Sequence, residues 1–139
     1  MRDLRAIFEP KSIAVVGATS NPMSVTNVTF LRQILDFGYP GRIYPVNPNV
    51  DEVMGLKAYA SIRDIPEPVD YVVCAISASA APKLMRECVA AKVKVVSLFT
   101  AGFSELGNEG AKLERELVEI ARRGGVLMLG PNCLGLHCR

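Results

Sequence analysis

Glycine and small hydroxyl residues follow the first apolar run of the sequence, and their chemistry suits a phosphate group. Gly17 is followed by Thr19 and Ser20, and Ser24 stands just before a segment whose apolar residues have helical spacing. A glycine lets a ligand approach the backbone, hydroxyls form hydrogen bonds, and a helix N-terminus presents unpaired N–H groups. This pattern predicts a cradle for a phosphate or diphosphate. In an alternative interpretation Ser24 is only a helix cap and Gly17 only a turn.

The fingerprints of two common nucleotide-binding loops are missing here. A dinucleotide site needs G-x-G-x-x-G and a carboxylate at the end of the second strand. In this sequence Gly17 is followed by Ala18, and the second apolar run ends in Val46 and Asn47. The G-x-x-x-x-G-K-[ST] loop that binds nucleoside triphosphates is absent as well. Dinucleotide binding is therefore disfavoured, although an NAD(H) redox sensor stays open as an alternative.

Small polar residues also follow three later apolar runs. Residues 77–79 offer two serines, residues 100–105 combine a threonine with a glycine, and residues 130–135 form a Gly- and Pro-rich turn. The side-chain amide of Asn132 can fix neighbouring loops. Cys133 could act as a nucleophile, but no His or acid is visibly placed to activate it, which favours a structural role.

The elements that position these loops can be read from the apolar pattern. Short β-branched runs predict buried strands, spacing at three and four predicts helices, and Pro45 should lie near the end of its strand. Residues 47–69 are expected to be irregular, with one short strand or helical turn. The alternation predicts an α/β fold: a Rossmann-like, doubly wound, mainly parallel sheet in three layers. The predicted strands are 12–17, 42–46, 70–76, 94–99 and 126–129, and the predicted helices begin after Ser24 and cover 79–91 and 108–123.

Composition limits the classes of protein that are possible. With 139 residues, 50% of them hydrophobic, the chain suits one domain with a proper core. Lys and Arg number 16 against 14 for Asp and Glu, a net charge of +2 that is spread along the chain. No apolar run approaches the roughly 18 residues that a membrane helix needs. We therefore expect neither nucleic acid nor a membrane as partner.

The cysteines indicate a reduced environment. Cys74, Cys88, Cys133 and Cys138 include no C-x-x-C pair, and His137 is not spaced to complete a zinc site. Cys74 and Cys88 fall in an apolar strand and a helix, so we expect them to be core residues. The N-terminal residues are unlike a secretory signal. A cytoplasmic location is expected.

Several strings of this sequence, taken in order, resemble one known family. They are S-I-A-V-V-G-A-T-S-N-P at 12–22, G-R-I-Y-P-V-N-P at 41–48, A-G-F at 101–103 with Glu105, and G-P-N-C-L-G at 130–135. These strings are similar to the CoA-binding domain of the nucleoside-diphosphate-forming acyl-CoA synthetases. That group includes ADP-forming acetyl-CoA synthetase and, more distantly, the succinyl-CoA synthetase alpha subunit. The resemblance spans nearly the whole chain.

The resemblance implies a set of residues that bind CoA. The first loop and the helix after it would hold the diphosphate, the loop after the second strand would lie by the nucleotide end, and the later loops would flank the rest of the ligand, with Asn132 near the reacting end. The implied residues are Gly17, Ala18, Thr19, Ser20, Ser24, Val25, Asn47, Pro48, Ile76, Ser77, Thr100, Ala101, Gly102 and Asn132.

The sequence departs from the family pattern at three places. Thr19 stands where Ser is usual, Gly is usual at the position of Thr26 or Asn27, and Asn49 replaces a Lys that often follows the second-strand Asn-Pro. The last change removes a candidate positive charge for a phosphate. Arg42 or Lys57 could substitute for it.

The resemblance also implies what lies outside this chain. Family members join a carboxylic acid to CoA through an acyl phosphate and a phosphorylated His in the next domain, and a separate ATP-grasp domain binds ATP or GTP with Mg. His137 is expected to be a surface or linker residue. We therefore expect residues 1–139 to be one CoA-binding domain of a larger synthetase, which would not catalyse alone and would partner the remaining domains or subunit. A stand-alone CoA-binding regulatory module is the alternative.

Overall fold

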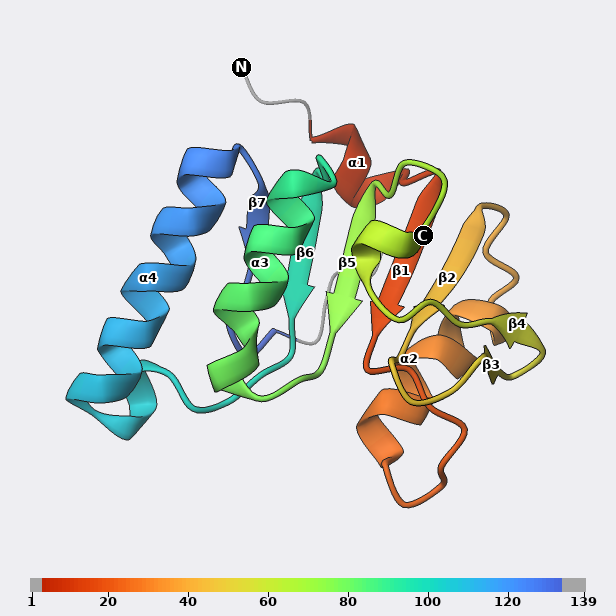
Figure 1. Cartoon of the computed structure of the whole chain (residues 1–139), viewed down its shortest axis with the longest axis horizontal. Coiled ribbons are helices and arrows are strands. Elements are labelled where there is room, and N and C mark those ends of the chain that lie inside the picture. The colour runs from red at the N-terminus through yellow and green to blue at the C-terminus, as the bar shows by residue number, and fades with distance from the viewer. Residues whose placement is uncertain (1–3, 134–139) are drawn as a thin grey trace.

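The computed structural model describes residues 4–133, which form a parallel sheet covered on both faces by helices. The strand order is β2-β1-β5-β6-β7, and every neighbouring pair in it is parallel (Figure 1). Each strand falls inside one of the predicted apolar runs, so the predicted parallel sheet is confirmed. The strands are β1 (Ser12–Val16), β2 (Arg42–Val46), β5 (Tyr71–Cys74), β6 (Val95–Leu98) and β7 (Leu127–Leu129).

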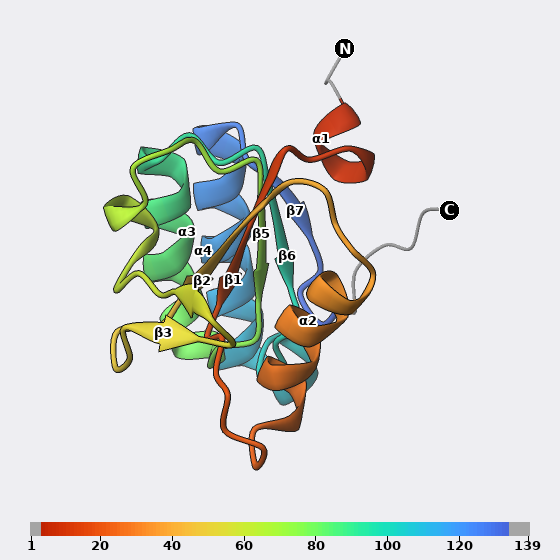
Figure 2. The ribbon, with the colours of Figure 1, turned by 90° about the vertical axis from the view of Figure 1, so that its right-hand side faces the viewer.

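The helices form the two outer layers. α1 (Arg5–Phe8) and α2 (Val25–Asp36) lie on one face of the sheet, and α3 (Ala81–Ala90) and α4 (Asn108–Gly124) lie on the other (Figure 2). A parallel sheet buries both faces, which explains its rows of Val, Ile and Ala. The doubly wound, three-layer architecture is therefore as predicted.

Two details of the helices differ from the sequence prediction. α1 has only four residues, too few to show a helical period, and it was not predicted. The apolar spacing within 108–123 predicts Leu117 and Val118 on one buried face of this helix, but Val118 is 43% exposed, whereas Leu117 is fully buried. Adjacent helical residues point about 100° apart, so both cannot face the sheet. On the solvent side of α4, Arg123 pairs with Glu119 at 2.6 Å.

The segment between β2 and β5 is more ordered than predicted. β3 (Glu52–Val53) and β4 (Leu56–Lys57) form a small antiparallel hairpin, and a 3-10 turn, η1 (Ile62–Asp64), follows. Ser61 caps this turn, since its hydroxyl accepts the Arg63 N–H at 3.1 Å. The prediction of one short strand or helical turn was therefore wrong, because the segment contains two short strands and a 3-10 turn. Two further 3-10 turns, η2 (Ala78–Ala80) and η3 (Ser104–Leu106), lie elsewhere.

β2 is an edge strand and contains Pro45 as its penultimate residue, as expected of a proline in a sheet. Beyond it the backbone of Tyr59 runs alongside the edge. Its N–H donates to the Pro45 carbonyl at 3.0 Å, and its carbonyl accepts the Asn47 N–H at 2.9 Å. These bonds tie the β3–β4 segment to the carboxyl end of β2.

The sulfur groups of Cys74 and Cys88 lie in the core, as predicted. Both residues are fully buried, and burial raises the pKa of Cys88 to about 12 and that of Cys74 further. Each thiol therefore stays protonated at neutral pH. Among residues 4–133, no helix combines the length and the apolar character that crossing a membrane requires.

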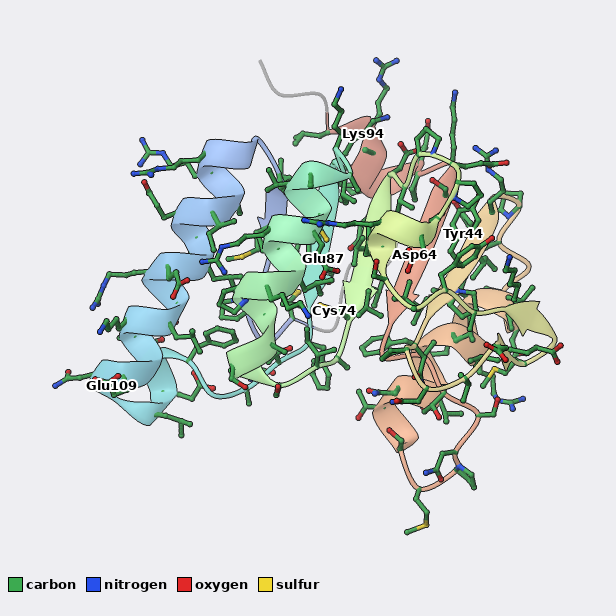
Figure 3. The ribbon with its side chains drawn as sticks, viewed as in Figure 1. Tyr44, Asp64, Cys74, Glu87, Lys94 and Glu109 are labelled. Carbon is green, nitrogen blue, oxygen red and sulfur yellow. The ribbon has the colours of Figure 1, made fainter. Side chains whose placement is uncertain are left out.

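A polar cluster joins three strands at the amino edge of the sheet. Asp70 accepts hydrogen bonds from Lys94 Nζ and from the Lys11 N–H, each at 2.8 Å, and its own N–H donates to Ser12 Oγ at 3.0 Å. Burial alone would raise the pKa of Asp70, but the hydrogen bonds from Lys94 and Lys11 outweigh it and hold the pKa below its ordinary value. Figure 3 shows Lys94 at this edge and Cys74 toward the other.

Candidate functional site

The strand order reverses between β1 and β5, and this places a crevice at their carboxyl ends. From β1 the chain passes to β2 on one side, and it then crosses to β5 on the other side. In open α/β sheets ligands bind at this switch point. The carboxyl ends lie along the lower edge of the sheet in Figure 1. There the first (residues 17–24), second (47–51), third (75–80), fourth (99–107) and fifth (130–133) loops begin.

Gly17 lies where three parts of the site meet. Its φ is +81°, and its N–H donates to the Val46 carbonyl at 2.9 Å. A side chain at this position would place its Cβ 3.1 Å from Asn27 Nδ2 and 3.2 Å from the Ala75 carbonyl oxygen. The first loop, α2 and the end of β5 therefore converge on a residue that has no side chain. The sequence predicted this glycine but gave no sign of Ala75.

The rest of the first loop is organised by short side-chain bonds. Asn21 N–H donates to Thr19 Oγ1 at 3.1 Å, and Met23 N–H donates to Asn21 Oδ1 at 3.0 Å. Ser20 is exposed. Ser24 occupies the N-cap position of α2, yet its hydroxyl makes no capping hydrogen bond, and Val25 begins the helix. The interpretation of Ser24 as only a cap is therefore not supported, and its hydroxyl is available to a ligand.

Asn47 uses its side chain to hold the first two loops together. Its Nδ2 donates to the Ala18 carbonyl at 2.9 Å, and its Oδ1 accepts the Asn49 N–H at 2.9 Å. Ala18 is fully buried, whereas Pro48 is exposed at the rim. Asn47 thus fixes the shape of the site through contacts that the sequence did not predict.

The third and fourth loops lie against each other. A Cβ on Gly102, whose φ is +109°, would come 3.0 Å from Ala78 Cβ. Ser77, which is exposed, shares a hydrogen bond of 3.2 Å with Ser79 through their hydroxyls, and Ile76 is half-buried beside the core. These loops form one continuous wall.

Glu105 closes the fourth loop on itself. Its carboxylate accepts the Gly102 N–H at 2.6 Å. That bond, with weaker contributions from the N–H groups of Glu105 and Phe103, lowers the pKa of Glu105. Phe103, fully buried, anchors the same loop to the core.

Thr100 carries a polar atom with no partner. The residue is 4% exposed, and among the described residues nothing within hydrogen-bonding distance satisfies its Oγ1. An unsatisfied buried hydroxyl costs about 1–3 kcal/mol. The Thr100 carbonyl accepts the N–H of Asn132 at 3.3 Å, which brings the fifth loop to the fourth. Ala101 and Asn132 are exposed, so a ligand lying along this edge can reach them.

Cys133 gains no support as a nucleophile. It is half-buried, its N–H donates to the Leu98 carbonyl at 2.9 Å, and the described chain contains no His that could act as its base. His137 and Cys138, on which the sequence made further predictions, lie outside the described residues.

A cavity of about 590 Å³ lies at the opposite, amino edge of the sheet. Its lining includes Lys11, Asp70 and Lys94, but no residue of the five loops. Asp70 is already bonded to Lys94 and to the Lys11 N–H, so its carboxylate has partners within the fold. We assign the candidate site to the carboxyl edge because the unsatisfied hydroxyl and the glycine convergence are found there.

Comparison with known proteins shows which proteins this chain is similar to. The family model described as a CoA binding domain matches residues 11–139. The chain is 42% identical over 134 residues to the ADP-forming acetate–CoA ligase II of Archaeoglobus fulgidus, covering 96% of this chain and 20% of that protein. It is 41% identical to the alpha subunit of the ADP-forming acetate–CoA ligase I of Pyrococcus furiosus, covering 96% of this chain and 29% of that subunit. The chain thus spans less than a third of these relatives.

Solved structures show the same architecture in chains of two sizes. The apo form of a dinucleotide-forming acetyl-coenzyme A synthetase 1 from Ca. Korarchaeum cryptofilum superposes with a TM-score of 0.90 at 42% identity, covering 96% of this chain and 28% of that one. A hypothetical protein from Pyrococcus horikoshii OT3 superposes with a TM-score of 0.73 at 25% identity, covering 94% of this chain and 82% of that one. The domain therefore occurs within long chains and also makes up most of a short one.

Proposed function

Because this chain belongs to the CoA-binding domain family, we propose that the diphosphate of coenzyme A binds in its first loop and at the N-terminus of α2. One observation carries this placement: Gly17 lets the first loop pack closely against Asn27 near the start of α2 and against the Ala75 carbonyl at the end of β5. A helix N-terminus attracts a diphosphate through its unpaired N–H groups. The hydroxyls of Thr19, Ser20 and Ser24 would complete the cradle, with Ala18 and Val25 adding backbone N–H groups.

The remaining loops would hold the remaining parts of the ligand. Asn47 and Pro48 would border the nucleotide end, with Asn47 acting by positioning the first loop. Ile76, Ser77, Ala101 and Gly102 would line the path of the pantetheine arm, and Asn132 would lie near its reacting end. Thr100 Oγ1 supports this path, since a polar ligand atom would satisfy it.

We infer that the whole protein is an ADP-forming acid–CoA ligase. The names of the relatives support this inference, and their greater length leaves room for the triphosphate site and the phosphorylated His that the family resemblance implies. The partners would then be the remaining domains or subunit, and this domain alone would catalyse nothing. We place the protein in the cytoplasm, in keeping with the buried thiols of Cys74 and Cys88.

A stand-alone CoA-binding module is the second candidate. The short hypothetical protein from Pyrococcus horikoshii supports it, because this chain covers most of that one. The reading frame that surrounds this sequence separates the two candidates. A stop codon directly after Arg139 favours the module, whereas an open frame that continues into further domains favours the ligase.

Isothermal titration calorimetry of this chain with CoA tests the binding function, and NADH serves as the competing ligand. We expect saturable binding of CoA at one site, and displacement of little or none of it by NADH. No heat with CoA, or tighter binding of NADH than of CoA, would contradict the proposal. A crystal soaked with CoA would then test each loop assignment.

A further inference from the structure

The candidate site has a shortage of positive charge. Within residues 4–133, none of the five loops contains Lys or Arg, whereas CoA carries a diphosphate and a separate phosphate monoester on its ribose. Backbone N–H groups at the start of α2 suit the diphosphate. A phosphate monoester is usually bound by a cationic side chain. The cation for this second phosphate must therefore come from an element that flanks the loops.

The structure places the two cations that the sequence suggested at opposite edges. Arg42 is the first residue of β2, so it lies at the amino edge, where it is ion-paired with Glu67. That pairing and that position remove Arg42 from the carboxyl edge. Lys57 ends β4, whose hairpin follows the second loop directly.

Lys57 is held beside the carboxyl end of β2 by aromatic and backbone contacts. Its Nζ lies 5.2 Å from the centroid of the Tyr59 ring. The Tyr59 backbone is bonded to Pro45 and to Asn47, and its ring packs edge-on against Tyr44 with centroids 5.9 Å apart. Across the hairpin Lys57 pairs in register with Glu52, but no carboxylate of the described residues is within 4.0 Å of its ammonium group.

The second loop is also next to the predicted diphosphate cradle. Asn47 Nδ2 donates to the Ala18 carbonyl, which ties the second loop to the first. A nucleotide whose diphosphate lies in the first loop would therefore pass the second loop, which the hairpin of Lys57 follows in the chain. Lys83 is exposed near the start of α3, beyond the third loop, and no part of the ligand is assigned to it. Lys83→Gln therefore removes the same charge as Lys57→Gln and serves as its control.

We propose that Lys57 binds the ribose 3′-phosphate of CoA and thereby distinguishes CoA from 3′-dephospho-CoA. This assignment rests on the proposed function. Lys57 acts as a specificity residue, since the ring of Tyr59 and the bonds from Tyr59 to the second loop keep its ammonium at the edge where the nucleotide end lies.

Calorimetric titration of CoA and of 3′-dephospho-CoA into the parent chain, Lys57→Gln and Lys83→Gln tests the assignment. The parent chain should bind CoA about tenfold more tightly than 3′-dephospho-CoA, the effect of one charge-assisted hydrogen bond. Lys57→Gln should abolish this preference while changing the affinity for 3′-dephospho-CoA less than about twofold. Lys57→Arg should restore the preference, and Lys83→Gln should keep it.

Three results would overturn the assignment. The first is an equal loss of affinity for both ligands in Lys57→Gln, which would make the residue structural. The second is loss of the preference in Lys83→Gln instead. The third is equal affinity of the parent chain for both ligands. Failure of the parent chain to bind either ligand would instead reject the proposed function itself. Thermal melts of each variant check folding, and Lys57→Arg keeps the test valid if Lys57→Gln is unstable.

Discussion

Two residues of the candidate site carry a local cost in stability. Thr100 buries a hydroxyl without a partner, and Gly17 adopts a positive φ that other residues avoid. Asn47 shows the opposite case, since both polar atoms of its amide have a partner within the protein and it serves the site by holding Ala18. Residues that leave a group unsatisfied are the ones we expect to contact the ligand directly.

Replacing Gly17 by Ala should weaken CoA binding by about tenfold or more, because its Cβ would press on Asn27 and on the Ala75 carbonyl. Gly55→Ala is the matched control: its φ is +80°, but no atom lies within 4 Å of the added Cβ. Each variant should lose about 1 kcal/mol of stability from the left-handed backbone. Calorimetry and urea unfolding measure the two effects, and equal CoA affinity in both variants would refute the site role of Gly17.

Replacing Thr100 by Val should separate stability from binding. The change removes a buried hydroxyl that has no partner, so the free energy of unfolding should stay equal or rise by about 1 kcal/mol. The affinity for CoA should nevertheless fall several-fold, because a hydrogen bond to the ligand is lost. Tyr39→Phe, which removes a hydroxyl bonded to the Pro10 carbonyl outside the five loops, is the control and should leave the affinity for CoA unchanged. A Thr100→Val protein that is clearly less stable would show that the hydroxyl has a partner within the protein.

Helices and strands could be predicted where the pattern of neighbouring residues indicates them. They could not be predicted where hydrogen bonds between residues far apart in the sequence hold them. The five strands of the sheet and the three long helices could be predicted, because apolar periodicity is written in neighbouring residues. The β3–β4 hairpin could not, since it is held to β2 by the backbone of Tyr59 rather than by any pattern of its own. The loops of the site were predicted from composition, whereas the contact of Gly102 with Ala78 and the engagement of Asn47 depend on the tertiary structure.

The amino edge of the sheet should respond to acid through Asp70. The folded pKa of this carboxylate is lowered, so its stabilisation is complete above the unfolded value near 3.8 and is lost as the pH falls through the folded pKa. Asp70→Asn should therefore cost about 2 kcal/mol at pH 7, and this difference from the parent chain should shrink below pH 4.

Urea unfolding from pH 7 to pH 2.5 measures this dependence. Glu119→Gln, which breaks only the exposed pair with Arg123, should cost less than about 0.5 kcal/mol. A loss in Asp70→Asn that stays constant across this pH range would argue against the ion pair with Lys94 and for a purely steric effect.

The molecule as a whole should be stabilised by its ligand, because the site draws on loops from every strand of the sheet. Ligand binding to the folded state alone adds about 2.7 kcal/mol to the free energy of unfolding at a CoA concentration one hundred times the Kd. Urea unfolding with and without CoA should show this gain with an unchanged denaturant slope. The Gly17→Ala variant should gain less at the same CoA concentration, and an equal gain would place the ligand elsewhere.

The edge of the sheet at β2 also determines how copies of this protein meet in concentrated solution. An unprotected edge strand offers a row of N–H and C=O groups to which a neighbouring molecule can add a strand, which is a route to aggregation. Here Pro45 brings no N–H, and Tyr59 already bonds to the Pro45 carbonyl. The carboxyl half of β2 is therefore closed to growth of the sheet, and the fold limits aggregation at the side where the loops of the candidate site begin.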